Sequence, residues 1–234
     1  MESYYKNYSN LNKETILSDI LLKASESPIK KPIKKSLKKS IKKLPNIDTA
    51  ERVESFQRFI SILLKNKFPK NKISKDSRNI LNKFSYKMID KIFIEAQTLC
   101  KISQRKTISD NEIKSAIGLI SFPEKIKKAA IEHGEKAVID VETSNNKQKR
   151  SRINERAKLV FPVGRIGTYL RDNKQNWIKG IGKSAPTFLT GAIEYIILQI
   201  LTLSHTNMQK EHKIIIQSVH IKEDSEIRKL LELF

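Results

Sequence analysis

One stretch, residues 74–101, constrains the fold of this chain more than any other. Its apolar side chains recur with the three-then-four spacing of a helix that has one wide apolar face: Ile80, Leu81, Phe84, Met88, Ile89, Ile92, Phe93, Ala96, Leu99 and Cys100. Ser74 suits an N-cap, and Asp76 places a negative charge in the first turn. At about 1.5 Å per residue, this helix would be roughly 40 Å long. It needs a partner that covers its apolar face, since it cannot be stable alone in water.

The flanks of this stretch predict two shorter helices. The first pattern ends near Pro69, and the second follows a serine cap at Ser109. Their apolar positions are Val53, Phe56, Phe59, Ile60, Leu63 and Leu64 before the long helix, and Ile113, Ala116, Ile117 and Ile120 after it. Both connecting straps, 70–72 and 105–106, are basic. The order short–long–short resembles a histone fold, which buries its apolar face only by clasping a second copy.

The rest of the chain repeats this order. A short helix opens at residues 161–165 and carries Ile166 and Leu170, and a long helix follows at 185–209. A strap at 210–213, a short segment at 217–221 and a last helix through Phe234 complete the second unit. We therefore predict an all-α chain in which two histone folds form an intramolecular handshake, a pseudo-heterodimer.

The segment boundaries follow from composition. We predict a disordered basic tail at 1–47, a first unit with a C-terminal helix at 48–142, a basic linker at 143–157 and a second unit at 158–234. The C-terminal helix, 123–142, is expected to be interrupted at Gly134. A flexible linker of about 15 residues spans roughly 20 Å, which is enough to join two clasped units.

The charge balance points to a polyanionic partner. Lys and Arg number 46 against 25 Asp and Glu, a net charge of +21. Nucleic acid is the leading candidate and an anionic membrane surface the second. The most apolar stretch, 192–203, is too short to span a bilayer and contains Glu194 and Gln199. No signal peptide is visible, and the single cysteine, Cys100, is expected to be a buried thiol in a reducing compartment.

Residues 28–43 are a four-residue basic repeat without an acidic residue. Its lysines are Lys30, Lys31, Lys34, Lys35, Lys38, Lys39, Lys42 and Lys43. Like charges repel, so we expect the segment to be disordered alone and to neutralise phosphates. A merely solvated tail or an import signal is the alternative. Residues 1–27 are mildly amphipathic, and their role stays open.

Several short motifs resemble core histones in order and approximate spacing, over residues 50–234. FPVGR at 161–165, Ala185-Pro186 and Glu194-Tyr195 resemble histone 2A, and 73–75, 105–109, 112–117 and 134–138 resemble histone 2B. A 2B-like unit fused to a 2A-like unit resembles the histone doublets of Marseillevirus-type large DNA viruses.

This resemblance implies how DNA would be bound. In the family the long helices cross antiparallel and each first loop lies beside the partner's second loop, where backbone N–H groups, helix N-termini and basic side chains meet phosphates. Arginines enter the minor groove. The implied DNA-binding residues are Lys72, Ser74, Lys75, Arg105, Lys106, Thr107, Arg165, Arg171, Lys179, Lys183 and Lys213. Lys179 or Lys183 takes the place of a groove-inserting arginine.

The chain departs from the family at several positions. Lys213 stands where the motif has a threonine–arginine pair, and a lysine cannot reproduce a planar fork. The acidic surface patch is thinned, since Glu194, Asp224 and Glu226 alone remain. Ile102 replaces a tyrosine that packs in the four-helix contact with histone 4.

These features predict a DNA-packaging histone doublet that wraps double-stranded DNA without sequence specificity in a nucleosome-like particle. A histone-fold transcription-factor subunit is the alternative. An enzyme or a membrane binder is disfavoured, because catalytic signatures and metal-ligand spacing are absent from the sequence. We expect no cofactor, metal, membrane or small-molecule substrate, and a histone 3/histone 4-like pair or doublet as partner. The expected location is the virion and the viral factory or host nucleus.

Overall fold

A computed structural model describes residues 55–121, 123–144, 152–223 and 225–232. Several predicted features lie outside the described residues: the N-terminal segment, the basic repeat 28–43, Val53, Asp224, Phe234 and the middle of the predicted linker. Predictions for them are not addressed by the structure. The described elements of both predicted units belong to one compact unit, 54–234, so the two halves are parts of one fold.

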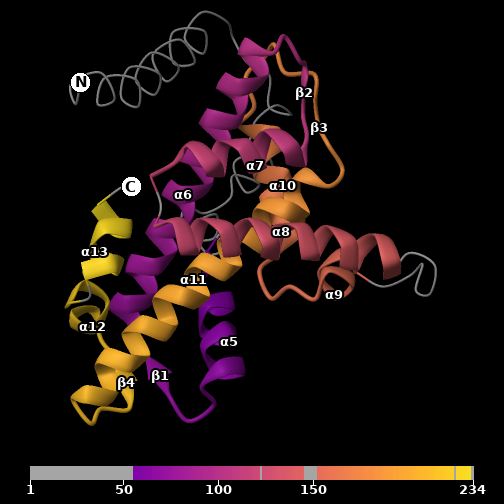
Figure 1. Cartoon of the computed structure of the whole chain (residues 1–234). Coiled ribbons are helices and arrows are strands. Elements are labelled where there is room, and N and C mark those ends of the chain that lie inside the picture. The colour runs from indigo at the N-terminus through magenta and orange to yellow at the C-terminus, as the bar shows by residue number, and fades with distance from the viewer. Residues whose placement is uncertain (1–54, 122, 145–151, 224, 233–234) are drawn as a thin grey trace, which may run out of the picture. The chain divides into compact units, whose positions relative to one another are not determined.

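The first half has the predicted short–long–short order (Figure 1). It comprises α5 (Gln57–Lys67), β1 (Lys72–Ile73), α6 (Lys75–Ile102), β2 (Thr107–Ile108) and α7 (Asp110–Leu119). The Ser74 hydroxyl caps α6 by accepting a hydrogen bond from Ser77 N at 3.1 Å, as the sequence predicted. At α7, Ser109 and Glu112 form a capping box, which fixes where that helix begins.

The first half ends with α8 (Glu124–Ser144), and the second half repeats the order after the short α9 (Ile153–Ala157). Then follow α10 (Val163–Asp172), β3 (Gly180–Ile181), α11 (Ala185–Lys210), β4 (Ile215–Ile216), α12 (Ser218–Glu223) and α13 (Ser225–Glu232).

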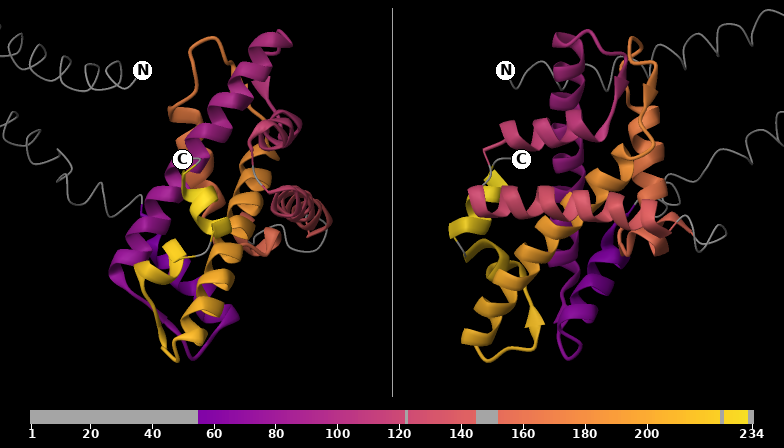
Figure 2. Two further views of the ribbon diagram at one scale, coloured as in Figure 1. Left: turned by 60° about the vertical axis from the view of Figure 1, so that its left-hand side comes forward. Right: turned by 45° about the vertical axis from the view of Figure 1, so that its right-hand side comes forward.

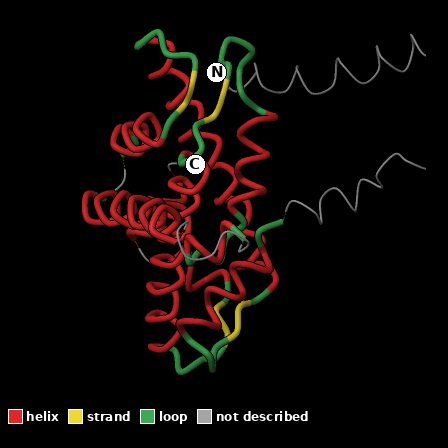
Figure 3. The backbone as a smooth tube through the Cα atoms, turned by 90° about the vertical axis from the view of Figure 1, so that its right-hand side faces the viewer, coloured by secondary structure: helices red, strands yellow, loops and turns green. Residues whose placement is uncertain are grey.

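The two halves clasp each other through their long helices and their straps. β1 pairs with β4 and β2 with β3, both in parallel, with Lys72 opposite Ile215 and Thr107 opposite Gly180. Because each pair joins the start of one long helix to the end of the other, α6 and α11 are antiparallel; Figure 2 shows them crossing. The strand pairs lie at opposite ends of the described fold (Figure 3). The predicted loop pairing is confirmed.

The core lies where the long helices cross. The buried side chains there include Phe84, Met88, Ile92 and Phe93 from α6 and Ile193, Ile196, Ile197 and Ile200 from α11. By length and composition alone α11 could cross a membrane, and it extends well beyond the apolar stretch 192–203. In the fold 72% of its most apolar window is buried, so its apolarity is that of a core helix.

Two predictions about the middle of the chain were wrong. α8 continues through Gly134, because that position lies against α11: a Cβ there would be 2.9 Å from the Phe188 carbonyl oxygen. The glycine permits a close helix crossing and is not a break. The predicted linker is also shorter, since α8 runs to Ser144 and residues 153–157 form α9. Ala157 is buried with Ala137, Val141, Leu159 and Val163, so α9 docks on α8 and α10.

Candidate nucleic-acid interface

The β2–β3 end gathers five of the predicted DNA-binding residues: Arg105, Lys106, Thr107, Lys179 and Lys183, all exposed. The Lys106 carbonyl accepts hydrogen bonds from Lys179 N at 2.7 Å and Gly180 N at 3.3 Å, so the two basic segments are tied side by side. The loop before β3 is held from α6, because the Gln97 side-chain oxygen accepts from Gln175 N at 2.7 Å. Folded backbone therefore positions these cations.

Arg105, which the resemblance implied as a DNA-binding arginine, also has a partner within the fold. Its Nη1 lies 2.6 Å from Oε1 of the buried Glu112, while its side chain stays 61% exposed. Burial raises the pKa of the Glu112 carboxyl, but the hydrogen bonds from Ser109 and Arg105 outweigh it and hold that pKa below its usual value. Arg105 thus neutralises the cap of α7 and presents its remaining donors to solvent. The capping-box spacing was readable in the sequence, but the arginine contact was not.

The β1–β4 end holds Lys72, Ser74, Lys75 and Lys213. Lys72 in β1 and Lys75 at the start of α6 are both exposed. The Ser74 hydroxyl is half-buried and occupied by Ser77, so its role here is to cap α6. Lys213 Nζ is 2.5 Å from Glu211 Oε2, and this contact with Lys213 lowers the pKa of Glu211. The same strap leaves Ile214 and Ile215 exposed.

A third cationic position lies where α5 and α10 converge. The Phe56 and Phe161 rings stack with centroids 5.3 Å apart, which brings the starts of the two helices together. The Arg165 guanidinium lies 5.4 Å from the centroid of the Phe59 ring, in cation–π geometry. Further along α10, the Arg171 guanidinium donates to Thr168 Oγ1 at 3.2 Å and stays exposed. The predicted DNA-binding residues that the structure describes therefore lie at the two strand-paired ends and along α10, which converges with α5.

Glu194 was predicted to belong to a thinned acidic surface patch, and that prediction was wrong. Its side chain is 6% exposed, and its Oε2 accepts hydrogen bonds from Val160 N and Phe161 N, each at 2.8 Å. Burial raises the pKa of Glu194 to about 7, although the two hydrogen bonds oppose that shift. Glu194 anchors the segment that leads into α10. The Glu226 side chain and Asp224 lie outside what the structure describes.

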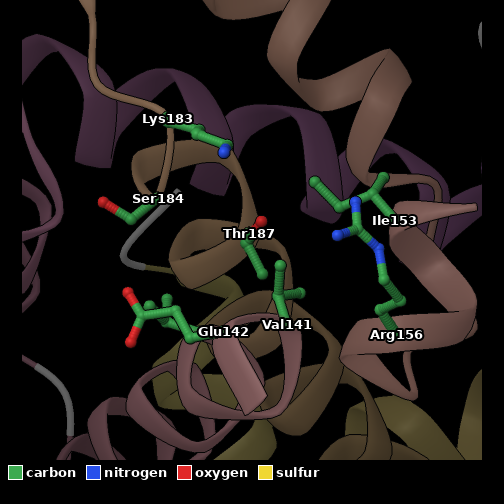
Figure 4. A pocket seen from close by; sticks show the side chains of 8 residues that line it. Val141, Glu142, Ile153, Arg156, Lys183, Ser184 and Thr187 are labelled. Atoms are coloured by element: carbon green, nitrogen blue, oxygen red, sulfur yellow. The ribbon is translucent and has the colours of Figure 1, made fainter. Parts of the chain in front are cut away.

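A pocket of about 180 Å³ opens beside the β2–β3 end, between α8, α9 and the start of α11. Val138, Val141 and Ile153 form its apolar part, and Arg156 and Lys183 border it with positive charge. Figure 4 shows Lys183 above Thr187, with Glu142 and Arg156 on different sides. Ser184 also lines the pocket, and its hydroxyl donates a hydrogen bond to Asp110 Oδ1 at 3.0 Å. The pocket marks where both halves and α9 meet.

Three of the four described histidines have structural partners. His133 lies 3.2 Å from the Gly191 carbonyl, His205 stacks on Phe68 with centroids 3.7 Å apart, and His220 lies 3.1 Å from Glu211. Among the described residues, no group of three or more His, Cys, Asp or Glu side chains could hold a metal ion. Cys100 is a buried free thiol, as predicted, and burial raises its pKa.

Comparison with protein families identifies the first half. Residues 59–117 match the family described as histone-like transcription factors (CBF/NF-Y) and archaeal histones. The match runs from α5 through most of α7, so these residues form a histone-fold domain. Histone-fold proteins bind DNA and dimerise with histone-fold partners. In this structure, the second short–long–short unit of the same chain packs against that domain through the crossing of α6 and α11 and the two strand pairs.

Proposed function

We propose that this protein is a histone doublet, a 2B-like unit fused to a 2A-like unit, that packages double-stranded DNA without reading its sequence. The observation that carries the proposal is the pair of strand-linked loops at opposite ends of one fold, each with exposed lysines. Phosphate contacts of this kind position DNA but carry little sequence information. The doublet relationship, and its resemblance to the histones of Marseillevirus-type viruses, are part of the proposal.

Nuclease protection on two unrelated DNA duplexes of equal length tests this function. We expect the same protected length and a similar affinity on both, because the interface offers charge and backbone groups to phosphates. The Lys106→Glu/Lys179→Glu double variant should weaken binding on both duplexes. A Lys128→Glu/Lys136→Glu double variant on α8 makes the same change in net charge away from the strand pairs and should bind nearly as the parent does.

A histone-fold transcription-factor subunit is the second candidate, and the matched family description includes such proteins. That function requires a partner that reads bases, so protection would be strong on one duplex and weak on the other. The two candidates thus predict opposite outcomes in the same experiment. Localisation follows from the packaging proposal: the virion and the viral factory or host nucleus, with Cys100 reduced.

A histone 3/histone 4-like pair is the proposed protein partner. Supporting this, α6 and the end of α7 carry apolar side chains that stay exposed among the described residues: Ile94 (55% exposed), Ile102 (75%) and Leu119 (62%). Ile102→Asp should abolish association with such a pair while leaving the melting curve of the free chain unchanged. Ile139→Asp on α8, where the side chain is 57% exposed, is the matched control. Sedimentation of the mixture measures the outcome.

A further inference from the structure

The pocket between α8, α9 and the start of α11 is not accounted for by the proposed DNA packaging. Lys183 alone among its lining residues belongs to the predicted DNA-binding set. Its volume of about 180 Å³ is below the roughly 300–1,000 Å³ of sites for drug-sized ligands. Helices from both halves of the fold enclose it, so it exists only when the halves are packed together. A pocket of this size and placement suits a small molecule.

Three side chains, called the apolar wall below, line one part of this pocket: Val138 and Val141 from α8 and Ile153 from α9. Val141 is buried, and the other two are half-buried. An apolar group that enters the pocket leaves water and packs against carbon, which is favourable. A bare inorganic ion gains nothing from this wall, because burial beside apolar groups disfavours a charge. The occupant therefore has an apolar body.

The side chain of Thr187 gives the pocket a polar end. Thr187 lies in the first turn of α11 and is only 2% exposed. Its hydroxyl makes no hydrogen bond with another residue that the structure describes. Figure 4 shows the hydroxyl oxygen on the side of Lys183 and the methyl group toward Val141. A buried hydroxyl without a partner is unfavourable, so a ligand oxygen that accepts its proton would be held there.

The charges around the pocket favour an anion. α11 begins beside it, the N-cap Ser184 hydroxyl donates to Asp110 and not to the helix, and the first turn has no acidic residue. The N–H groups of that turn thus keep the positive end of the helix dipole beside the pocket. Arg156 and Lys183 add two positive charges to the lining, and Glu142 adds one negative charge. The single positive charge that remains matches a monoanion better than a dianion.

We propose that this pocket binds a small organic acid. Its carboxylate accepts hydrogen bonds from Thr187, Arg156 and Lys183, and its short hydrocarbon body packs on the apolar wall. A guanidinium presents paired N–H donors that match the two oxygens of a carboxylate, and Figure 4 shows the Arg156 guanidinium reaching into the pocket from α9. Because the bound acid contacts α8, α9 and α11 together, it stabilises the packed halves by mass action. DNA phosphates lack an apolar body, so this site is distinct from the DNA interface.

Hexanoate is the probe, titrated into the full chain without DNA. We expect the methyl NMR signals of the apolar wall to shift and to saturate with a Kd of about 1 mM, an affinity that a ligand of this size can reach. Acetate has the charge without the body, and 1-hexanol has the body without the charge. Each should bind at least about ten-fold more weakly than hexanoate, since each loses one part of the site. Hexanoate should also raise the melting temperature.

Two substitutions and a matched control locate the carboxylate. Thr187→Val replaces the hydroxyl that has no described partner by a methyl group, so it should keep the parent's melting temperature and bind hexanoate about ten-fold more weakly. Lys183→Gln should also weaken hexanoate binding. Lys179→Gln makes the same change in charge at another exposed lysine, which does not line the pocket, and should bind hexanoate as the parent does.

Four results would overturn the inference. Methyl signals that do not shift, or that shift without saturating, would mean that the pocket holds no such ligand. Equal affinity for 1-hexanol and hexanoate would remove the carboxylate from recognition. Equal losses in Lys183→Gln and Lys179→Gln would make the binding a response to overall charge, and unchanged affinity in Thr187→Val would place the acid elsewhere. DNA is absent from every arm, so the outcome is independent of the nuclease-protection test of the proposed function.

Discussion

Gly134 of α8 and Gly191 of α11 meet so closely that a Cβ built on Gly191 would lie 3.1 Å from the Gly134 Cα. The two helices belong to different halves of the fold, and α8 lies across α11 at this point (Figure 2). The His133 ring adds a contact to the Gly191 carbonyl at 3.2 Å. Close backbone packing at this crossing therefore provides a second set of contacts that holds the two halves together, in addition to the crossing of α6 and α11.

Gly134→Ala should destabilise the protein by about 1–3 kcal/mol, because the new Cβ meets the Phe188 carbonyl at 2.9 Å and the crossing must open. Gly118→Ala is the matched control, since a Cβ on that α7 residue meets nothing within 4 Å. The control should be neutral or gain up to about 1 kcal/mol from helix propensity. Denaturant unfolding measures both. Equal free energies of unfolding for the two variants would show that α8 does not need the close approach.

Phe93→Asp should abolish cooperative folding. The side chain is 2% exposed in the shared core, and an unpaired carboxylate there costs several kcal/mol, comparable to the whole stability of a domain. Ile196→Asp, from the facing long helix, should behave in the same way. Ile94→Asp changes the adjacent residue, which is 55% exposed, and should melt within a few degrees of the parent. A cooperative melt near the parent's for Phe93→Asp would contradict the clasped core.

Glu194 should make the stability depend on pH. Its pKa is about 7 in the folded protein against an ordinary value of 4.5, so between these values the folded state binds more protons than the unfolded state. Its contribution to stability is therefore fully present at low pH and is lost as pH rises through that window. Glu194→Gln keeps an oxygen acceptor for Val160 N and Phe161 N but cannot ionise.

The difference between parent and Glu194→Gln isolates this group from the other titrating residues. We expect the variant to gain stability relative to the parent as pH rises from about 4.5 to 7, by on the order of 1–3 kcal/mol in total. Chemical denaturation at a series of pH values measures the difference. If the free energies of unfolding of the two proteins changed with pH in the same way, burial would not raise the pKa of Glu194.

The parts of this fold that could be predicted are those that depend on residues close together in the sequence. The apolar periodicity of residues 74–101, the cap at Ser74 and the two straps are properties of neighbouring residues, and the structure has them as expected. Features that depend on what a residue meets in three dimensions could not be predicted. Gly134 was interpreted as a break and Glu194 as a surface acid, since only the packing against α11 and the loop before α10 decides their roles.

The same distinction holds for the interface. The sequence placed basic residues on the straps, and the register of β2 with β3 brings those of one end together. It did not indicate that Glu112 engages Arg105 or that Glu211 engages Lys213, because an acid seven residues or two residues away has many possible orientations. Because of the two pairings, each end offers less positive charge to DNA than its number of basic residues suggests.

Arg105→Ala should lower both stability and DNA affinity, because the Arg105 side chain serves the fold and the interface at once. Removing the guanidinium leaves the buried Glu112 carboxylate with only its Ser109 contacts, which should cost about 1 kcal/mol after allowance for the exposure of Arg105. Loss of one phosphate or groove contact should cost about 1–3 kcal/mol of DNA-binding free energy. Lys106→Ala removes the neighbouring charge and should lower affinity alone.

Hydroxyl-radical footprinting on two unrelated duplexes shows where along the DNA each variant loses protection. Arg105→Ala should weaken protection where the β2–β3 end lies, and Arg165→Ala should do so where α5 and α10 converge, since Arg165 is held over Phe59. Because a guanidinium fits a narrowed minor groove through its shape and weak hydration, each loss should be similar on both duplexes. Protection lost on one duplex and kept on the other would mean that these arginines read bases, and the transcription-factor function would then be favoured over packaging.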